Sequence, residues 1–95
     1  MTELPAELWP EDLAEVLYVD HYGNAVTGLR GGSISPAQQL QGGRQVVKYA
    51  RVFAESPAGT AFWYENANGL VEIAVNLGNA AATLGLQPGD PVTLL

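Results

Sequence analysis

Short segments in which side chains of different polarity alternate recur along this chain. The clearest is Leu70–Val75, where Val, Ile and Val alternate with Leu, Glu and Ala. Alternation with a period of two predicts a β-strand. Because both sets are largely apolar, we expect both faces of this strand to be covered. Glu72 is the exception, and it either lies at a strand edge in water or points into a polar pocket.

Similar patterns predict further strands, separated by turns rich in Gly, Asn and Pro, which favour turn conformations. The further predicted strands are Glu15–Val19, Ala25–Leu29, Gln45–Phe53, Thr60–Glu65 and Pro91–Leu94. Asn79–Leu84 is predicted to be a short helix, and Arg30–Gly43 a polar loop with a helical turn after Ser35.

These elements predict one domain of mostly β structure. A chain of 95 residues has the size of a single domain. Short strands with Gly and Pro turns and one helix near the C-terminus favour a small barrel or sandwich. A closed antiparallel β-barrel leaves no strand edge exposed, which suits apolar strands. We therefore assign residues 14–95 to a barrel and residues 1–13 to an arm or linker, whose Trp9 either packs on the barrel or faces a partner.

Charge and composition narrow the range of partners. The formal net charge is -6, and the only fixed cations are Arg30, Arg44, Lys48 and Arg51, which argues against nucleic acid or an anionic membrane as a partner. There is no Cys, which favours a reducing compartment. No apolar run approaches the roughly 20 residues of a membrane span, and the N-terminus lacks a signal-peptide pattern. We expect a cytoplasmic protein.

The side chains that most often carry catalysis are scarce. A single His excludes a metal site built from paired His ligands. That residue, His21, lies beside Asp20 in a predicted turn, where we expect it to be exposed. No Ser lies in a G-x-S-x-G elbow, and the paired glycines lack the phosphate-loop pattern. We therefore expect neither catalytic residues nor a metal site in this chain alone.

Residues typical of binding sites gather instead at the predicted strand ends. Asp20, Tyr22 and Asn24 share one turn, and Phe53 ends another strand. The second hairpin is flanked by Asn66, Asn68 and Asn76. An aromatic ring can stack on a base, an Asn amide offers a donor and an acceptor, and a carboxylate can pair with an ammonium group. The set suits a planar polar ligand, and the alternative is ordinary turn chemistry and core packing.

Three stretches together resemble a known family. Val16–Leu29 reads VLYVDHYGNAVTGL, Ala50–Gly59 reads ARVFAESPAG, and Phe62–Val92 reads FWYENANGLVEIAVNLGNAAATLGLQPGDPV. D-x-[FY]-G-N near the start, followed by L-x-E-I-A-V-N-x-G-x-A-A and L-G-L-x-x-G-D, is a specific combination. Over roughly residues 14–95 the chain resembles the C-terminal domain of the S-adenosylmethionine hydroxide adenosyltransferase family, which includes the bacterial fluorinase and chlorinase.

This resemblance implies a closed, Greek-key-like antiparallel barrel that forms part of a larger enzyme. In the family, an α/β N-terminal domain precedes the barrel, and the subunits form trimers. S-adenosylmethionine lies between the N-terminal domain of one subunit and the barrel of the next. It is the substrate, so no cofactor is implied. Water or hydroxide, or halide in the halogenases, attacks the C5′ carbon and releases methionine.

The resemblance also implies roles for individual residues at the adenine end of the site. Tyr22 would stack on or flank the adenine, Asn24 would hydrogen-bond its edge, and Phe53 would pack against the base. The backbone near Asn76 and Leu77 would complete the adenine pocket.

The methionine end departs from the family pattern. Asp20 would meet the methionine ammonium. Ala67 stands where the family often has a Ser that contacts the methionine end, and Asn68 follows where the halogenases carry an Arg. The Asp, Arg and His that handle the nucleophile lie in the family's N-terminal domain, and His21 does not correspond to that His.

Three hypotheses follow for the function. The first is the adenine-side half of the S-adenosylmethionine site of an S-adenosylmethionine hydrolase, which gives adenosine and L-methionine and whose catalytic N-terminal domain is absent from this chain. The barrel alone would then be inactive. The second is a stand-alone module that binds a nucleoside or S-adenosylmethionine. The third is an oligomerisation domain without chemistry.

Overall fold

The computed structural model describes residues 13–51 and 57–95. Trp9 with most of the predicted arm, and the predicted binding residue Phe53, lie outside these described residues. The elements in chain order are β1 (Leu13–Val19), β2 (Ala25–Arg30), the 3-10 turn η2 (Gly31–Ser33), β3 (Leu40–Gly42), β4 (Gln45–Tyr49), β5 (Ala61–Glu65), β6 (Leu70–Val75), α1 (Ala80–Leu84) and β7 (Val92–Leu94).

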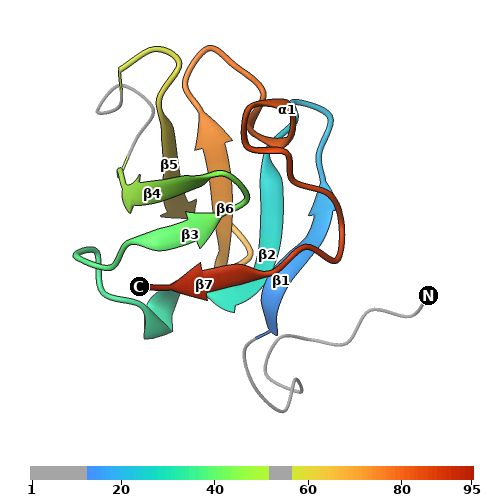
Figure 1. The fold of residues 1–95 in the computed structure, drawn as a ribbon. Helices are drawn as coiled ribbons and strands as arrows, with labels where there is room; N and C mark the ends of the chain where they lie inside the picture. The colour runs from blue at the N-terminus through green and yellow to red at the C-terminus, as the bar shows by residue number, and fades with distance from the viewer. Residues whose placement is uncertain (1–12, 52–56) are drawn as a thin grey trace.

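The strands form one curled sheet in the order β1-β2-β6-β5-β4-β3-β7 (Figure 1). An antiparallel bridge between Glu15 and Pro91 links β1 to the segment that enters β7. Two backbone hydrogen bonds support this seam, from Val16 N–H to the Asp90 carbonyl at 2.8 Å and from Gly89 N–H to the Val16 carbonyl at 2.7 Å. The sheet is therefore a nearly closed barrel, and the predicted mostly β barrel with one short helix is confirmed.

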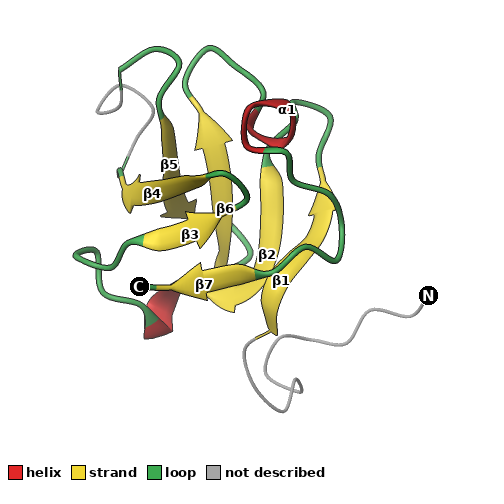
Figure 2. Ribbon diagram, viewed as in Figure 1, coloured by secondary structure: helices red, strands yellow, loops and turns green. Residues whose placement is uncertain are grey.

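The helix α1 lies at one end of the barrel, while η2 lies at the other end (Figure 2). The pairing between β4 and β5 is parallel, whereas the other strand pairs are antiparallel. The sequence did not predict this parallel pair, because the pattern of apolar and polar residues within β4 does not indicate which strand lies next to it.

Two predicted boundaries were wrong. The predicted loop Arg30–Gly43 contains β3, which pairs with both β4 and β7. A strand of three residues is too short to display a period of two. After Ser35 the chain makes one hydrogen-bonded turn, in which the Gln38 N–H donates to the Ser35 carbonyl at 2.9 Å and the Ala37 N–H donates to the Ser35 hydroxyl oxygen at 3.1 Å. The strand predicted over Gln45–Phe53 ends at Tyr49.

The barrel interior is filled by large apolar side chains, of which Trp63 and Leu84 are 1% and 0% exposed. The Trp63 indole N–H donates to the Gln38 carbonyl at 2.9 Å, so its one polar atom is satisfied. All six residues of β6 are buried, which confirms that both faces of this strand are covered. The outer face of β5 and β6 carries a second buried cluster that includes Phe62 and Ala74.

A buried hydroxyl joins β2 to β6 where their register is interrupted. The pairing shifts between Val26 and Arg30. There the Thr27 hydroxyl donates to the Val71 carbonyl at 2.8 Å and accepts from the Leu29 N–H at 3.2 Å. The side chain thus satisfies backbone groups that the shifted ladder leaves unpaired.

Candidate functional site

The turn between β1 and β2 is built around the side chain of Asp20. Its Oδ1 accepts hydrogen bonds from the backbone N–H groups of Tyr22 and Asn24, both at 2.9 Å. This local side-chain-to-backbone bonding is typical of Asp in turns. Gly23 has φ of 83°, which a residue with a side chain adopts at a cost. The result is a defined turn in which Tyr22 is 75% exposed while Asn24 is only 8% exposed.

The start of α1 holds this turn in place. The Asn79 side chain caps the helix by accepting from the Ala82 N–H at 2.9 Å. The backbone N–H of Ala81, which also has no acceptor within the helix, donates to the Gly23 carbonyl at 2.9 Å. The contact is tight, since a Cβ on Gly23 would lie 2.2 Å from the Asn79 Cγ. The β1–β2 turn and the helix start therefore form one unit.

A second turn connects β6 to α1. The Gly78 N–H donates to the Val75 carbonyl at 3.1 Å, which closes a four-residue turn. Leu77 occupies the third position of this turn with φ of 58°, the one positive φ at a non-glycine residue within the described parts of the chain. An apolar side chain in this conformation is strained by about 1–2 kcal/mol. Leu77 is also 88% exposed. A strained, exposed leucine is typical of a functional surface rather than of a structural one.

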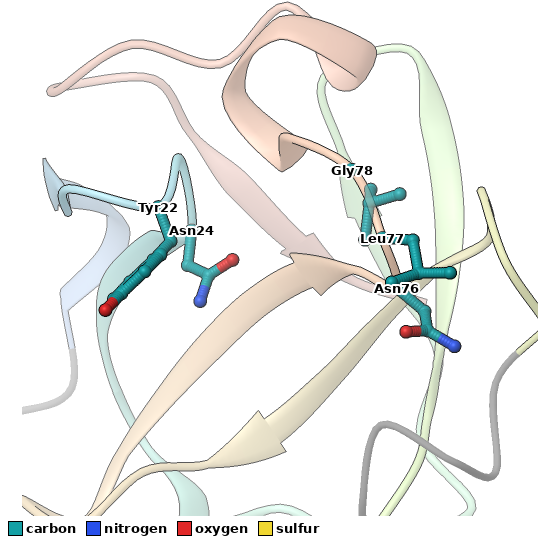
Figure 3. A pocket seen from close by; sticks show the side chains of 6 residues that line it. Tyr22, Asn24, Asn76, Leu77 and Gly78 are labelled. Atoms are coloured by element: carbon teal, nitrogen blue, oxygen red, sulfur yellow. The ribbon is translucent and has the colours of Figure 1, made fainter.

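The two turns face each other across a pocket of about 610 Å³. Its lining residues are Tyr22, Asn24, Val75, Asn76, Leu77 and Gly78. Figure 3 shows Tyr22 and Asn24 on one side and Asn76 and Leu77 on the other. The pocket thus combines an exposed aromatic ring, an exposed aliphatic side chain and two side-chain amides, a combination suited to a flat polar molecule.

Behind the pocket, Glu72 is the centre of a buried hydrogen-bond network. Its Oε2 accepts from Asn24 Nδ2 at 3.1 Å and from the Tyr64 hydroxyl. Its Oε1 accepts from Asn66 Nδ2 at 3.1 Å. Glu72 is 7% exposed, so of the two alternatives for this residue the polar pocket is correct. The signal in the sequence was a single carboxylate in an otherwise apolar strand.

Burial is the main reason that the pKa of Tyr64 is raised well above its ordinary value near 10, and the hydrogen bond to Glu72 and the negative charge nearby raise it further. Tyr64 therefore keeps its proton at neutral pH and acts as a donor to the Glu72 carboxylate.

A family model described as the SAM hydroxide adenosyltransferase C-terminal domain matches residues 14–93. The chain belongs to this family. The sequence resemblance is thereby confirmed over nearly the whole barrel.

Related proteins agree with this assignment. The chain is 39% identical over all 95 of its residues to an (R)-S-adenosyl-L-methionine hydrolase of Thermus thermophilus, of which it covers 36%. It is 38% identical over 78 residues to a protein of the same name from Salinispora arenicola, of which it covers 30%. The chain therefore spans about a third of the length of these relatives.

Solved structures show the same barrel. A conserved protein from Thermus thermophilus superposes with a TM-score of 0.77 at 38% identity, over 99% of this chain and 43% of that protein. A conserved protein from Thermotoga maritima superposes with a TM-score of 0.76 at 27% identity, over 87% of this chain and 35% of that protein.

The residues that the adenosyltransferase resemblance singled out fall into separate groups. Tyr22, Asn24, Asn76 and Leu77 line the pocket together. Asp20 lies in the same turn, where its Oδ1 orders the backbone.

Ala67 and Asn68 lie in the β5–β6 turn, next to the first residue of β6, whereas Asn76 follows its last residue. Because a strand rises about 3.3 Å per residue, the ends of six-residue β6 lie about 16 Å apart. The barrel alone does not bring Ala67 and Asn68, two of the three predicted methionine-end residues, to the pocket. His21 is exposed, as expected.

Among the described residues, no group of three or more His, Cys, Asp or Glu side chains could hold a metal ion. In the same part of the chain, no helix is long and apolar enough to span a membrane.

Proposed function

We propose that this barrel supplies the adenine-side half of an S-adenosylmethionine site in an S-adenosylmethionine hydrolase. The observation that carries the proposal is the pocket in which Tyr22 and Asn24 from one turn face Asn76 and Leu77 from another. Tyr22 flanks the adenine ring, Asn24 hydrogen-bonds its edge, and the 76–77 backbone closes the pocket. The two relatives named (R)-S-adenosyl-L-methionine hydrolase support S-adenosylmethionine as the substrate.

The other half of the site comes from an α/β N-terminal domain of the same family, in a trimer where the barrel of one subunit faces the N-terminal domain of the next. Tyr22 is 75% and Leu77 is 88% exposed. Exposed apolar side chains at a pocket rim are typical of a surface that another domain covers. Covering this rim would also exclude bulk water from the reacting centre.

In the proposed reaction, the oxygen of water or hydroxide attacks the C5′ carbon of S-adenosylmethionine. The C5′–S bond breaks and its electron pair stays on sulfur, so the products are adenosine and L-methionine, with one proton released when water is the nucleophile. Since the sulfonium is already positive, the leaving group needs no proton. The contribution of the barrel is to position the adenosyl group for in-line attack.

A second candidate is a nucleoside-binding module without chemistry. One observation favours it: Ala67 and Asn68, two of the expected methionine-end residues, lie at the opposite end of β6 from the pocket. Such a module would bind adenosine as well as it binds S-adenosylmethionine.

A backbone-amide NMR titration of the chain with adenosine, then with S-adenosylmethionine, tests the binding. We expect shifts grouped at Tyr22, Asn24, Asn76 and Leu77, with the Ala67 amide as an internal control that adenosine leaves unmoved. Absence of shifts at millimolar adenosine, both for the chain alone and after a family N-terminal domain is added, would contradict the adenine half-site.

The chemistry is tested by the same mixture of barrel and N-terminal domain. Adenosine released from S-adenosylmethionine above the rate of either component alone supports the hydrolase. Binding of adenosine without release of product from a folded complex would instead favour the binding module.

A further inference from the structure

The side-chain amide of Asn24 is held from behind by a carboxylate. Asn24 Nδ2 donates to Glu72 Oε2 at 3.1 Å, between two side chains that are 8% and 7% exposed. Asn24 lies in the β1–β2 turn, directly before the first residue of β2, and Glu72 lies on β6, so their contact links positions 48 apart in the chain. The contact therefore ties the β1–β2 turn to β6.

Glu72 is itself held by further donors, so it cannot easily turn away. The Tyr64 hydroxyl donates to the same oxygen as Asn24, and Asn66 Nδ2 donates to the other oxygen at 3.1 Å. A carboxylate only accepts hydrogen bonds. With both oxygens engaged as acceptors, the group that Asn24 turns toward Glu72 must be its NH2.

The orientation of the amide determines what the pocket offers a ligand. Asn24 Nδ2 is turned toward Glu72, so Asn24 Oδ1 points toward the wall of the pocket that Asn76 and Leu77 form (Figure 3). Among the described residues, no hydrogen-bond donor is directed at Asn24 Oδ1. Asn24 therefore presents an acceptor to the pocket, and one N–H beyond the one bound to Glu72.

An acceptor beside one N–H matches the edge of adenine, whose exocyclic amino group donates and whose adjacent ring nitrogen accepts. A 6-oxo purine places a carbonyl oxygen where adenine has its amino group, so two acceptors would face each other. We infer that Glu72 is a positioning residue that fixes the Asn24 amide and thereby makes the pocket select 6-amino over 6-oxo purine nucleosides, an inference that rests on the nucleoside site proposed above.

Adenosine and inosine, which differ at this one position, provide the test. We expect the wild-type chain to bind adenosine at least about tenfold more tightly than inosine, the discrimination typical of a bidentate base contact. In Glu72→Gln, one oxygen becomes an NH2, so Asn24 can take either orientation. The ratio of the two dissociation constants should then fall to about threefold or less, whereas a merely structural change would weaken both ligands equally and leave the ratio intact.

Tyr64→Phe is the matched control. It removes one donor from the same carboxylate but leaves the Asn24–Glu72 contact in place, so its adenosine-to-inosine ratio should equal that of the wild type. An unchanged ratio in Glu72→Gln, or a wild type that binds both nucleosides equally, would overturn the role of Glu72 and leave the nucleoside site standing. A wild type that binds neither nucleoside, even with the N-terminal domain added, would overturn both proposals.

A second readout does not depend on the variant folding. In the unliganded wild-type chain, one of the two Nδ2 protons of Asn24 should exchange with solvent at least about tenfold more slowly than those of exposed Asn68, because a hydrogen-bonded proton exchanges only after its bond opens. Equal exchange for both residues would mean that the contact does not persist in solution, and the inference would fail.

Discussion

The carbonyl oxygen of Gly23 accepts a hydrogen bond from the backbone N–H of Ala81 at 2.9 Å. This bond joins the β1–β2 turn to the first turn of α1, and Ala81 lies 58 positions after Gly23 in the chain. The turn carries Tyr22 and Asn24, and α1 follows directly on the turn of Asn76 and Leu77. This backbone bond thus links the two segments that carry the walls of the pocket.

Gly23→Ala should therefore destabilise the fold and disturb the pocket. The positive φ alone costs about 1–2 kcal/mol, and the added Cβ would lie 2.2 Å from the Asn79 side chain. Gly89→Ala is the matched control, since Gly89 has φ of 92° but nothing within 4 Å of its Cβ position. Chemical denaturation should show a larger loss for Gly23→Ala than for Gly89→Ala. Equal losses would mean that the contact with Asn79 relaxes at no cost.

Tyr22→Ala should weaken adenosine binding by about 1–3 kcal/mol, the usual contribution of an aromatic ring that stacks on a base. Tyr22 is largely exposed in the barrel, so the free energy of unfolding should change by less than about 0.5 kcal/mol. Tyr18→Ala is the control, because it removes a ring that is 47% exposed but does not line the pocket, and it should leave adenosine binding unchanged. Titration calorimetry that shows the same loss for both variants would remove the stacking role.

Leu77→Asn should separate the effect of backbone strain on stability from the effect of the leucine side chain on adenosine binding. Asn tolerates a positive φ better than Leu does, so the free energy of unfolding should rise by up to about 1 kcal/mol. Leu77→Ala is the control, because it also removes the leucine side chain that lines the pocket but keeps the strained backbone. Both variants should bind adenosine more weakly, and only the Asn variant should be more stable than the wild type. An Asn variant no more stable than the Ala variant would indicate that the turn carries no strain.

The raised pKa of Tyr64 predicts loss of stability in alkali. The unfolded chain releases this proton near the ordinary pKa of about 10, while the folded protein retains it because burial and Glu72 disfavour the phenolate. The folded state then binds more protons than the unfolded state, so the free energy of unfolding falls as the pH rises above about 10. Below that pH the contribution is fully present.

Denaturation of wild type and Tyr64→Phe at several pH values measures this effect. At neutral pH the Phe variant should be less stable by about 1–2 kcal/mol, since it lacks the hydrogen bond to Glu72. The difference between the two proteins should narrow from about pH 10 upward. A difference that stays constant up to pH 11 would show that Tyr64 titrates alike in the folded and unfolded states.

Much of the barrel was predictable because its signals are local. The alternation within Leu70–Val75, the Asn-Gly turn before it and the Asn that caps α1 each depend on residues a few positions apart. Strand β3 was missed because three residues are too few to show a period, and the parallel pairing of β4 with β5 because a strand does not encode its neighbour.

Part of the candidate pocket could be named from the sequence. The resemblance named Tyr22, Asn24, Asn76 and Leu77, and the fold brings these four to one pocket. Ala67 and Asn68 lie elsewhere, at the opposite end of β6.

By itself, the sequence determined the strand-forming segments, the turns, the family and the residue types available for binding, because all of these depend on composition and short-range order. The tertiary structure decided which of those residues meet. Whether Glu72 faced water or a polar pocket depended on Asn24, a residue 48 positions away. Contacts at that separation are set by strand order and by closure of the barrel, to which the whole core contributes.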